Sequence, residues 1–121
     1  MRFLVLVVLS LAIFSLSTAQ GTPGNWTPVQ WNPNNDNLVG ILDYAVGQVT
    51  FAAMGVGQLS PDYWQWTNVI SVQTQVASGT NYEFIVDIAS SSGGTAKLTV
   101  IVLTSEDETS ESLVNYTLSK M

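Results

Sequence analysis

The residues of this chain that could do chemistry are its carboxylates. Histidine and cysteine are both absent, so the Cys-His and Ser-His pairs that activate nucleophiles cannot be built, and the usual zinc sites are excluded. Two carboxylates placed across a substrate can act as general acid and base, as in glycoside hydrolysis. The candidates for such a pair are Asp43, Asp62, Asp87, Glu106, Asp107, Glu108 and Glu111.

The last four of these carboxylates lie in one acidic stretch, Ser105 to Ser112 (SEDETSES). Its low complexity is more typical of a solvated surface turn than of a catalytic pair. It also lacks the alternating aspartates and the glycine of an EF-hand calcium loop. We therefore expect a binding protein that is not an enzyme and that uses neither a metal nor another cofactor. A small carboxylate-based enzyme remains a minor alternative.

The N-terminus has the three parts of a secretory signal peptide. A basic start at Arg2 precedes an apolar run at 3–14, and small residues follow at 17–19. The apolar run is too short for a membrane anchor, which needs roughly 20 residues. The sequence therefore predicts a cleaved signal over 1–19. The mature chain, 20–121, is expected to form one domain that is extracellular or in the secretory and lysosomal pathway.

The charge of the mature chain restricts its partners. Two lysines, Lys97 and Lys120, oppose nine acidic residues, so the net charge is −7. Nucleic acid and acidic membrane surfaces both need a positive footprint, so neither is expected as a partner. Without cysteine, packing alone must stabilise the domain, although small secreted domains usually carry disulfides. Sequons at Asn25 and Asn115 offer two glycan acceptors.

The first half of the mature chain predicts an arm and a helix. Residues 21–35 are rich in Gly, Pro and Asn, which favours an extended, poorly ordered arm with at most a short strand around 26–31. A helix should follow, with Asn35 or Asp36 as its N-cap and glycines up to Gly57 at its end. Its apolar residues recur at helical spacing and predict one buried stripe, made of Leu38, Ile41, Leu42, Ala45, Val46, Val49, Ala52 and Ala53.

The second half predicts antiparallel strands. The strongest signal is Trp66 to Ile88, which alternates as two strands joined by a tight turn at Gln75 to Gly79. A flexible link at Ser90 to Gly94, a strand at Thr95 to Thr104, the acidic turn and a strand at Leu113 to Ser119 complete the chain. The core face of the first strand is predicted to hold Trp66, Ile70, Val72 and Val76, with Val69 on the opposite face.

These elements together predict an α+β fold. One long amphipathic helix precedes strands that are connected by hairpins, so neighbours in sequence should be neighbours in the sheet. The helix must bury its stripe against one sheet face. We therefore expect one helix packed across a four- to five-stranded antiparallel sheet.

The turn of the first hairpin carries a family resemblance. Gln75-Val76-Ala77-Ser78-Gly79 resembles the Gln-x-Val-x-Gly motif of the cystatins, the protein inhibitors of papain-like cysteine proteases. The chain is most similar to the cysteine-free plant type. Leu42-Asp43-Tyr44-Ala45-Val46 is similar to the helix signature of the family, and Gly24 to Val29 is similar to its glycine-bearing arm. The similarity covers essentially the whole mature chain from Gly24 onward.

Two departures from the family pattern stand out. The central valine of the motif is Ala77, and the Pro-Trp pair that family members carry in the second hairpin loop is replaced by the acidic Ser105 to Ser112. The resemblance implies a wedge made of the arm and two hairpin loops, of which this chain keeps the first two parts. The implied protease-binding residues are Gly24, Gln75, Val76, Ala77, Ser78 and Gly79.

The resemblance implies a secreted, reversible thiol protease inhibitor. We expect a monomer, because Ala77 lacks the β-branched side chain that strains the family's loop valine and opens domain-swapped dimers. The main alternative is a non-inhibitory secreted interaction module with the same fold. The acidic turn could also adjust the choice of protease by favouring basic clefts. Four tryptophans offer a weaker carbohydrate-binding alternative, and Trp64 is the one best placed for partner contact.

Overall fold

The computed structural model describes residues 24–120. Its one long helix, α1 (Asp36–Gly55), has 20 residues and packs against the sheet. The side chain of Asn35 accepts a hydrogen bond from the backbone N–H of Leu38 at 3.2 Å, which confirms Asn35 as the N-cap. The helix ends at Gly55, close to the predicted glycines. The predicted signal peptide, 1–19, lies outside the described residues.

The buried stripe of α1 follows the prediction with one exchange. Ala52 is only partly buried, and Thr50 is buried instead. The hydroxyl of Thr50 donates to the carbonyl of Val46 at 2.8 Å, so this polar group is satisfied inside the core. By length and composition alone α1 could cross a membrane, but its apolar stripe packs against the sheet, as in the core helix of a globular domain.

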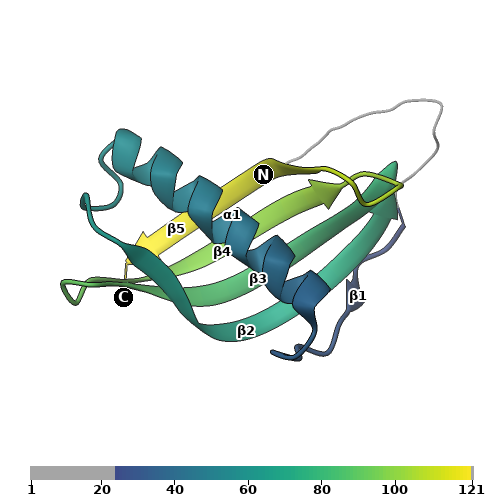
Figure 1. Cartoon of the computed structure of the whole chain (residues 1–121), viewed down its shortest axis with the longest axis horizontal. Helices are drawn as coiled ribbons and strands as arrows, with labels where there is room; N and C mark the ends of the chain where they lie inside the picture. Colours follow the sequence, from purple (N-terminus) through teal and green to yellow (C-terminus); the bar gives the residue numbers. More distant parts are fainter. Residues whose placement is uncertain (1–23, 121) are drawn as a thin grey trace.

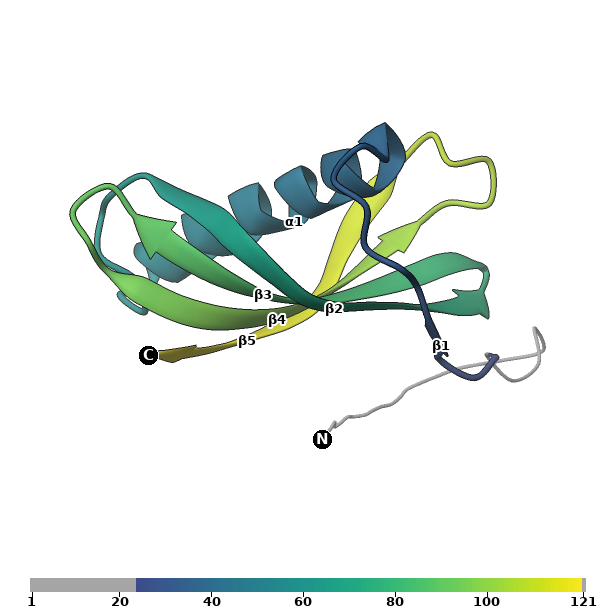
Figure 2. The same ribbon diagram turned by 90° about the horizontal axis from the view of Figure 1, so that it is seen from below.

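Five strands form one antiparallel sheet in the order β1-β2-β3-β4-β5 (Figure 1). Helix α1 crosses one face of this sheet (Figures 1 and 2). The α+β fold, with one helix packed on an antiparallel sheet in the cystatin-like arrangement, is therefore confirmed, and the number of strands is five. Their bounds are β1 (Thr27–Pro28), β2 (Trp64–Ala77), β3 (Gly79–Ser90), β4 (Thr95–Thr104) and β5 (Glu111–Lys120).

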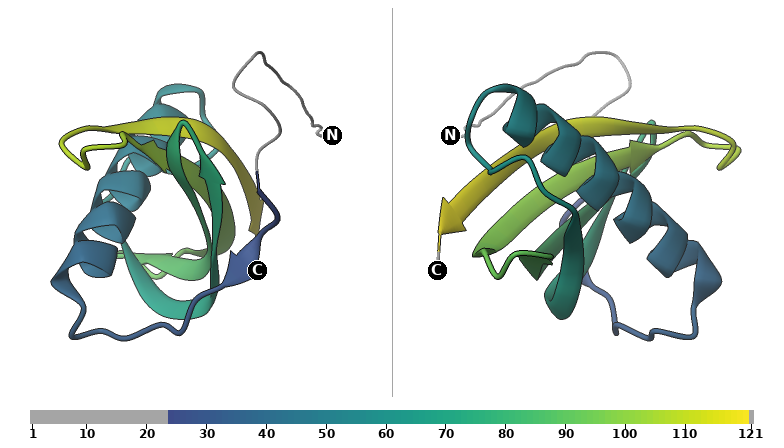
Figure 3. Two further views of the ribbon diagram at one scale, coloured as in Figure 1. Left: turned by 90° about the vertical axis from the view of Figure 1, so that its right-hand side faces the viewer. Right: turned by 60° about the vertical axis from the view of Figure 1, so that its left-hand side comes forward.

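The core lies between α1 and the concave face of the sheet, which curves around one side of the helix (Figure 3). Alternate residues of β3 and β4 are fully enclosed there, as the period-2 pattern predicts. No described helix covers the opposite, convex face. The sheet residues with the lowest exposure are Phe84, Val86, Ile88, Leu98, Val100 and Val102.

Strand β2 departs from the predicted alternation. Ile70 was predicted to face the core but is 47% exposed, whereas Val69 was predicted to face outward but packs against the core. The register with β3 shifts between Trp66 and Asn68 and again between Val69 and Ser71. Each shift leaves one residue of β2 without an opposite partner in β3, as a β-bulge does, and so reverses the faces of β2 beyond it. The prediction for Ile70 and Val69 was therefore wrong.

Val76 was also predicted on the core face and is 70% exposed. It lies at the end of β2, beside the hairpin turn, where the buried stripe of α1 does not cover it. We call this end of the sheet the tip end, which holds the β2–β3 turn and the β4–β5 loop (Figure 2).

The turns are shorter than predicted. β3 begins at Gly79, so Ser78 alone separates β2 from β3. β5 begins at Glu111, inside the predicted acidic turn. The predicted flexible link at Ser90 to Gly94 is a hydrogen-bonded turn, in which the backbone N–H of Ser90 donates to the carbonyl of Gly94 at 2.8 Å.

The tryptophans beside the strands serve the core. Trp64 is 8% exposed and its indole N–H donates to the carbonyl of Ser60 at 3.1 Å, so the expectation that it contacts a partner was wrong. Trp66 donates to a carboxylate oxygen of Asp43 at 2.8 Å and meets Trp31 edge-on, with ring centroids 5.6 Å apart. Trp66 thus ties β2 to the helix and to the arm, and Trp64 ties β2 to the loop that follows the helix.

Candidate functional site

The N-terminal arm runs along the free edge of β2 and ends at the tip. Thr27 and Pro28 pair with Thr74 and Gln73. Further along, the backbone N–H of Gly24 donates to the carbonyl of Val76 at 2.8 Å. The arm and the first hairpin therefore form one continuous edge, although about 50 residues separate them in the chain (Figure 2).

The tip of the first hairpin combines a tight turn with an exposed apolar side chain. Ala77 faces Gly79 in the register, and Val76 faces Thr80. The carbonyl oxygen of the Gln75 side chain accepts a hydrogen bond from the amide of Asn81 at 3.0 Å, across the same two strands. Gln75 therefore braces the hairpin, while Val76 and Ser78 project to solvent.

Gly79 is required by the hairpin itself. Its φ of +105° lies in a region that side chains disfavour, and a Cβ built there would lie 2.1 Å from the backbone oxygen of Thr104. The absence of a side chain thus lets the start of β3 approach the end of β4 closely. Among the six predicted site residues, Gly79 shapes the edge by allowing this approach.

The second hairpin loop is ordered by hydrogen bonds of its own. The Ser105 hydroxyl donates to Asp107 at 2.7 Å and accepts from the backbone N–H groups of Thr109 and Ser110, both at 3.1 Å. The hydrogen bonds from Ser105 and Thr109 hold the pKa of Asp107 below its usual range. The loop is therefore held in one turn conformation by its own hydrogen bonds, and Asp107 keeps its negative charge to a lower pH than an ordinary aspartate.

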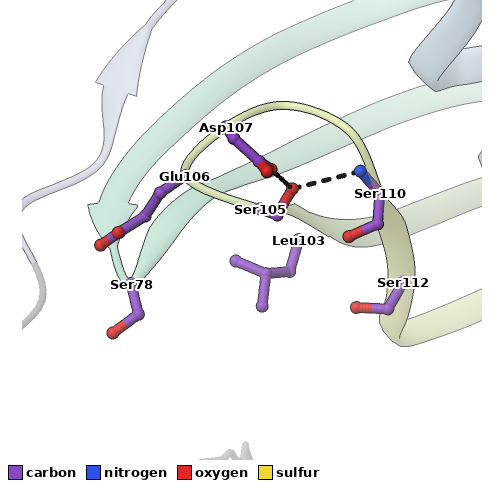
Figure 4. Close-up of a pocket in the computed structure, with 7 residues that line it drawn as sticks. All are labelled: Ser78, Leu103, Ser105, Glu106, Asp107, Ser110 and Ser112. Carbon is purple, nitrogen blue, oxygen red and sulfur yellow. Dashed lines mark hydrogen bonds between the residues drawn. The ribbon is translucent and has the colours of Figure 1, made fainter.

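A cavity of about 540 Å³ opens between the two hairpin loops (Figure 4). Ser78 lines it from the first hairpin, and the second hairpin contributes Leu103 and residues of the acidic turn. We call this cavity the loop cleft. The sequence alone could not locate this cavity, because the register of β3 on β4 decides which residues of the two loops face each other. The only sign of the cavity in the sequence is Leu103, an apolar residue close to the acidic stretch.

The structure brings the predicted site residues together at the tip end. Gly24, Val76, Ala77, Ser78 and Gly79 lie at or beside the β2–β3 turn. Gln75 is one residue further into the sheet, with its side chain used in the brace to Asn81. The arm, the first hairpin and the acidic turn all lie at this end in Figures 1 and 2.

The other carboxylates are tied into structural hydrogen bonds at separate places. Asp43 accepts from Trp66, and Asp62 accepts from the hydroxyls of Ser91 and Ser92, which lowers the pKa of Asp62. Asp62 thereby fastens the loop after α1 to the β3–β4 turn. Within residues 24–120, no group of three His, Cys, Asp or Glu side chains is arranged to hold a metal ion.

Comparison of the sequence with models of known protein families gave no match, and a search of curated proteins found no similar sequence.

Proposed function

We propose that this chain is a secreted, reversible inhibitor of papain-like cysteine proteases, related in type to the cystatins. The observation that carries the proposal is the hydrogen bond of 2.8 Å between Gly24 and Val76. It joins the arm to the first hairpin at the end of the sheet where the second hairpin loop also lies. Such an edge has the three-part layout that the resemblance implies for a wedge.

The physical properties of this edge suit a deep and narrow cleft. Gly24, Ala77 and Ser78 are small, so backbone can approach backbone closely. Val76 presents an apolar side chain that is 70% exposed and that an enzyme surface could bury. The short turn and the Gln75 brace limit the conformational entropy that would be lost on binding.

Inhibition by this edge would need no chemistry of its own. A hairpin held in the cleft blocks substrate without placing a peptide carbonyl in attack geometry at the thiolate of the protease. The hydrogen bonds between β2 and β3 keep the turn folded back on itself. The inhibitor would therefore be released intact, and inhibition would be reversible and competitive with substrate.

The departures from the family pattern lower the expected affinity. Loss of a buried interface tryptophan typically costs about 2 kcal/mol, or roughly 30-fold in Kd. A valine-to-alanine exchange at Ala77 would cost about 1 kcal/mol if the enzyme contacts that side chain. We therefore propose moderate rather than very tight inhibition, by a monomer.

A second candidate is a non-inhibitory interaction module with the same fold. The observation that favours it is the acidic turn that stands where similar inhibitors carry Pro-Trp. Such a module would keep the edge and bind a partner other than the cleft of a protease. Inhibition assays separate the two candidates.

The test of the proposed function compares two chains that differ by one residue. A chain of residues 24–121 keeps the N–H that reaches Val76, whereas a chain of 25–121 lacks it. We expect the first to inhibit papain competitively and the second to bind roughly tenfold more weakly, from one lost hydrogen bond and the lost arm contact. Steady-state kinetics measures both inhibition constants.

Thermal unfolding supplies the control for this comparison. Both chains should unfold within about 1 kcal/mol of each other, because the bond lies at the exposed end of the arm. Equal inhibition by the two chains would show that Gly24 does not contribute to binding the protease. Absence of inhibition by either chain at high micromolar concentration would favour the non-inhibitory module.

A further inference from the structure

We infer that Asn115 carries an N-linked oligosaccharide and that Pro28 keeps the second acceptor triplet, at Asn25, unmodified. The inference goes beyond protease binding and rests only on the proposed secretion of the chain, since N-linked sugar is added in the secretory pathway. It assigns a use to one of the two sequons and a reason why the arm stays free of sugar.

The side chain of Asn115 is free to carry a large group. Asn115 is exposed on β5, the strand at one edge of the sheet (Figure 1). Its Oδ1 accepts a hydrogen bond from the backbone N–H of Tyr116 at 2.9 Å, and within residues 24–120 no group accepts one from its Nδ2. Nδ2 is the atom that bonds to the sugar, so attachment would break no hydrogen bond of the described chain.

The fold directs Asn115 and Thr117 away from the core. Tyr116, between them, packs against the core and donates from its hydroxyl to the side chain of Gln58 at 2.7 Å. Successive residues of a strand point to opposite faces, so Asn115 and Thr117 lie on the convex face, which no described helix covers. A sugar on Asn115 would therefore extend into solvent.

The local sequence distinguishes the two acceptor triplets. Asn25-Trp26-Thr27 is followed directly by Pro28, whereas Asn115-Tyr116-Thr117 is followed by Leu118. A proline holds the residue before it in an extended conformation, so Pro28 resists the bend in which the glycosyl transferase binds its acceptor triplet. This restriction acts on the chain before it has folded, which is when the sugar is added. Asn115 should therefore be the acceptor that is used.

The reaction transfers an oligosaccharide from a lipid diphosphate to Asn115. Nδ2 of Asn115 attacks the anomeric carbon of the first sugar, and a C–N bond forms as the bond from that carbon to the diphosphate oxygen breaks. The lipid diphosphate leaves with the electron pair of the broken bond, and the amide nitrogen loses one proton to a base of the transferase. The hydroxyl of Thr117 binds the triplet to the enzyme.

The two acceptors differ in their position relative to the proposed binding edge. Asn25 is exposed and follows Gly24, whose N–H donates to Val76 at the tip end. Asn115 lies four residues into β5 from Glu111, about 13 Å at roughly 3.3 Å per residue. Strands β3 and β4 separate β5 from β2 by about 14 Å, at roughly 4.8 Å per strand. A glycan on Asn25 would cover the edge, whereas a glycan on Asn115 would leave it free.

The first experiment identifies the acceptor. The full chain is produced in cultured animal cells, and the mass of the secreted protein is measured before and after an amidase removes N-linked sugar and converts the acceptor asparagine to aspartate. We expect one glycan, located at residue 115 by peptide mass spectrometry. Asn115→Gln and Thr117→Ala should abolish it, whereas Thr117→Ser, which keeps the hydroxyl, and Asn25→Gln should retain it. A secreted chain without sugar, or a glycan on Asn25 of the unaltered chain, would overturn the inference.

The second experiment tests the role of Pro28. Pro28→Ala should add a second glycan to the secreted chain, because Thr27 is then free to bend. Asn25→Gln in the same chain should remove this second glycan, which locates it at residue 25. A single glycan on the Pro28→Ala chain would overturn the role given to the proline.

Inhibition of papain separates this inference from the proposed function. Asn115→Gln should leave the inhibition constant within about twofold of the wild type. The doubly glycosylated Pro28→Ala chain should inhibit at least about tenfold more weakly, because its second glycan covers the binding edge. Pro28→Ala combined with Asn25→Gln lacks that glycan and should inhibit as the wild type does.

The outcomes for sugar and for inhibition are independent of each other. A glycan on Asn115 without inhibition of any protease would remove the proposed function and keep the modification site. Inhibition by a secreted chain that carries no sugar would keep the function and overturn the site. A chain that stays inside the cell without sugar would overturn both the site and the proposed secretion.

Discussion

Replacing Gly79 with alanine should destabilise the domain by about 3 kcal/mol. Two effects add at this position. The φ of +105° disfavours any side chain, and the new Cβ would lie 2.1 Å from the backbone oxygen of Thr104. Relief of this overlap requires β3 and β4 to separate at the tip end, where they are hydrogen-bonded neighbours. Urea unfolding followed by tryptophan fluorescence measures the loss directly.

Gly93→Ala is the matched control for this prediction. Gly93 has a φ of +100°, nearly that of Gly79, but nothing lies within 4 Å of a Cβ built there. The Gly93→Ala variant should therefore lose only about 1 kcal/mol of stability, which is the cost of placing a side chain at a positive φ. If the two variants lost equal stability, the close approach of Gly79 to Thr104 would not be a feature of the protein.

Replacing Val76 with aspartate should weaken protease inhibition on the order of 100-fold, because an unpaired charge would be buried in the complex. The domain should fold as before, since Val76 is 70% exposed, and neither its backbone hydrogen bond with Gly24 nor its pairing with Thr80 in the sheet depends on the side chain. Inhibition constants for papain measure the effect on binding, and urea unfolding measures the effect on stability.

Ile70→Asp controls for added charge and for the loss of an exposed apolar group. Ile70 lies on the same strand and is 47% exposed, but it is remote from the tip end. It should leave the inhibition constant within about twofold of the wild type, as is usual for a surface substitution away from an interface. A Val76 variant that inhibited as well as the Ile70 variant would exclude the first hairpin from the interface.

The fold could be predicted from the sequence because two independent signals agreed. The helical stripe from Leu38 to Ala53 and the strict alternation of β4 each specify one buried face. Short connections between the strands then leave few topologies. Asn35 also marked the start of the helix through its capping side chain.

The faces of β2 could not be predicted because bulges are set by pairing between strands. Ile70 and Val69 are both β-branched and apolar, so the sequence offers no choice between them. The register shifts beside them depend on how β2 fits β3 and the helix. The exposure of Val76 had a similar cause, because the length of strand beyond the helix is a property of the assembled fold.

The candidate edge was predictable only in part. The turn residues from Gln75 to Gly79 stood out through their spacing, whereas the hydrogen bond that places Gly24 against Val76 appears only in the structure. The sequence could not separate the residues that form the edge from those that support it, because this depends on contacts in the folded chain. The close approach of Gly79 to Thr104 is one such contact. The loop cleft likewise appears only when both hairpins are in place.

The measurement that tests the central claim most directly maps the surface used by the complex. Isotope-labelled protein is mixed with papain whose active-site thiol has been blocked by a small methylthio group, and amide signals are followed by NMR. The account predicts changes confined to the tip end: Gly24, Val76 to Gly79, and the acidic turn from Ser105 to Ser112. No changes at high micromolar concentration, or changes centred on the exposed Phe51 and Val56 at the other end of the domain, would contradict it.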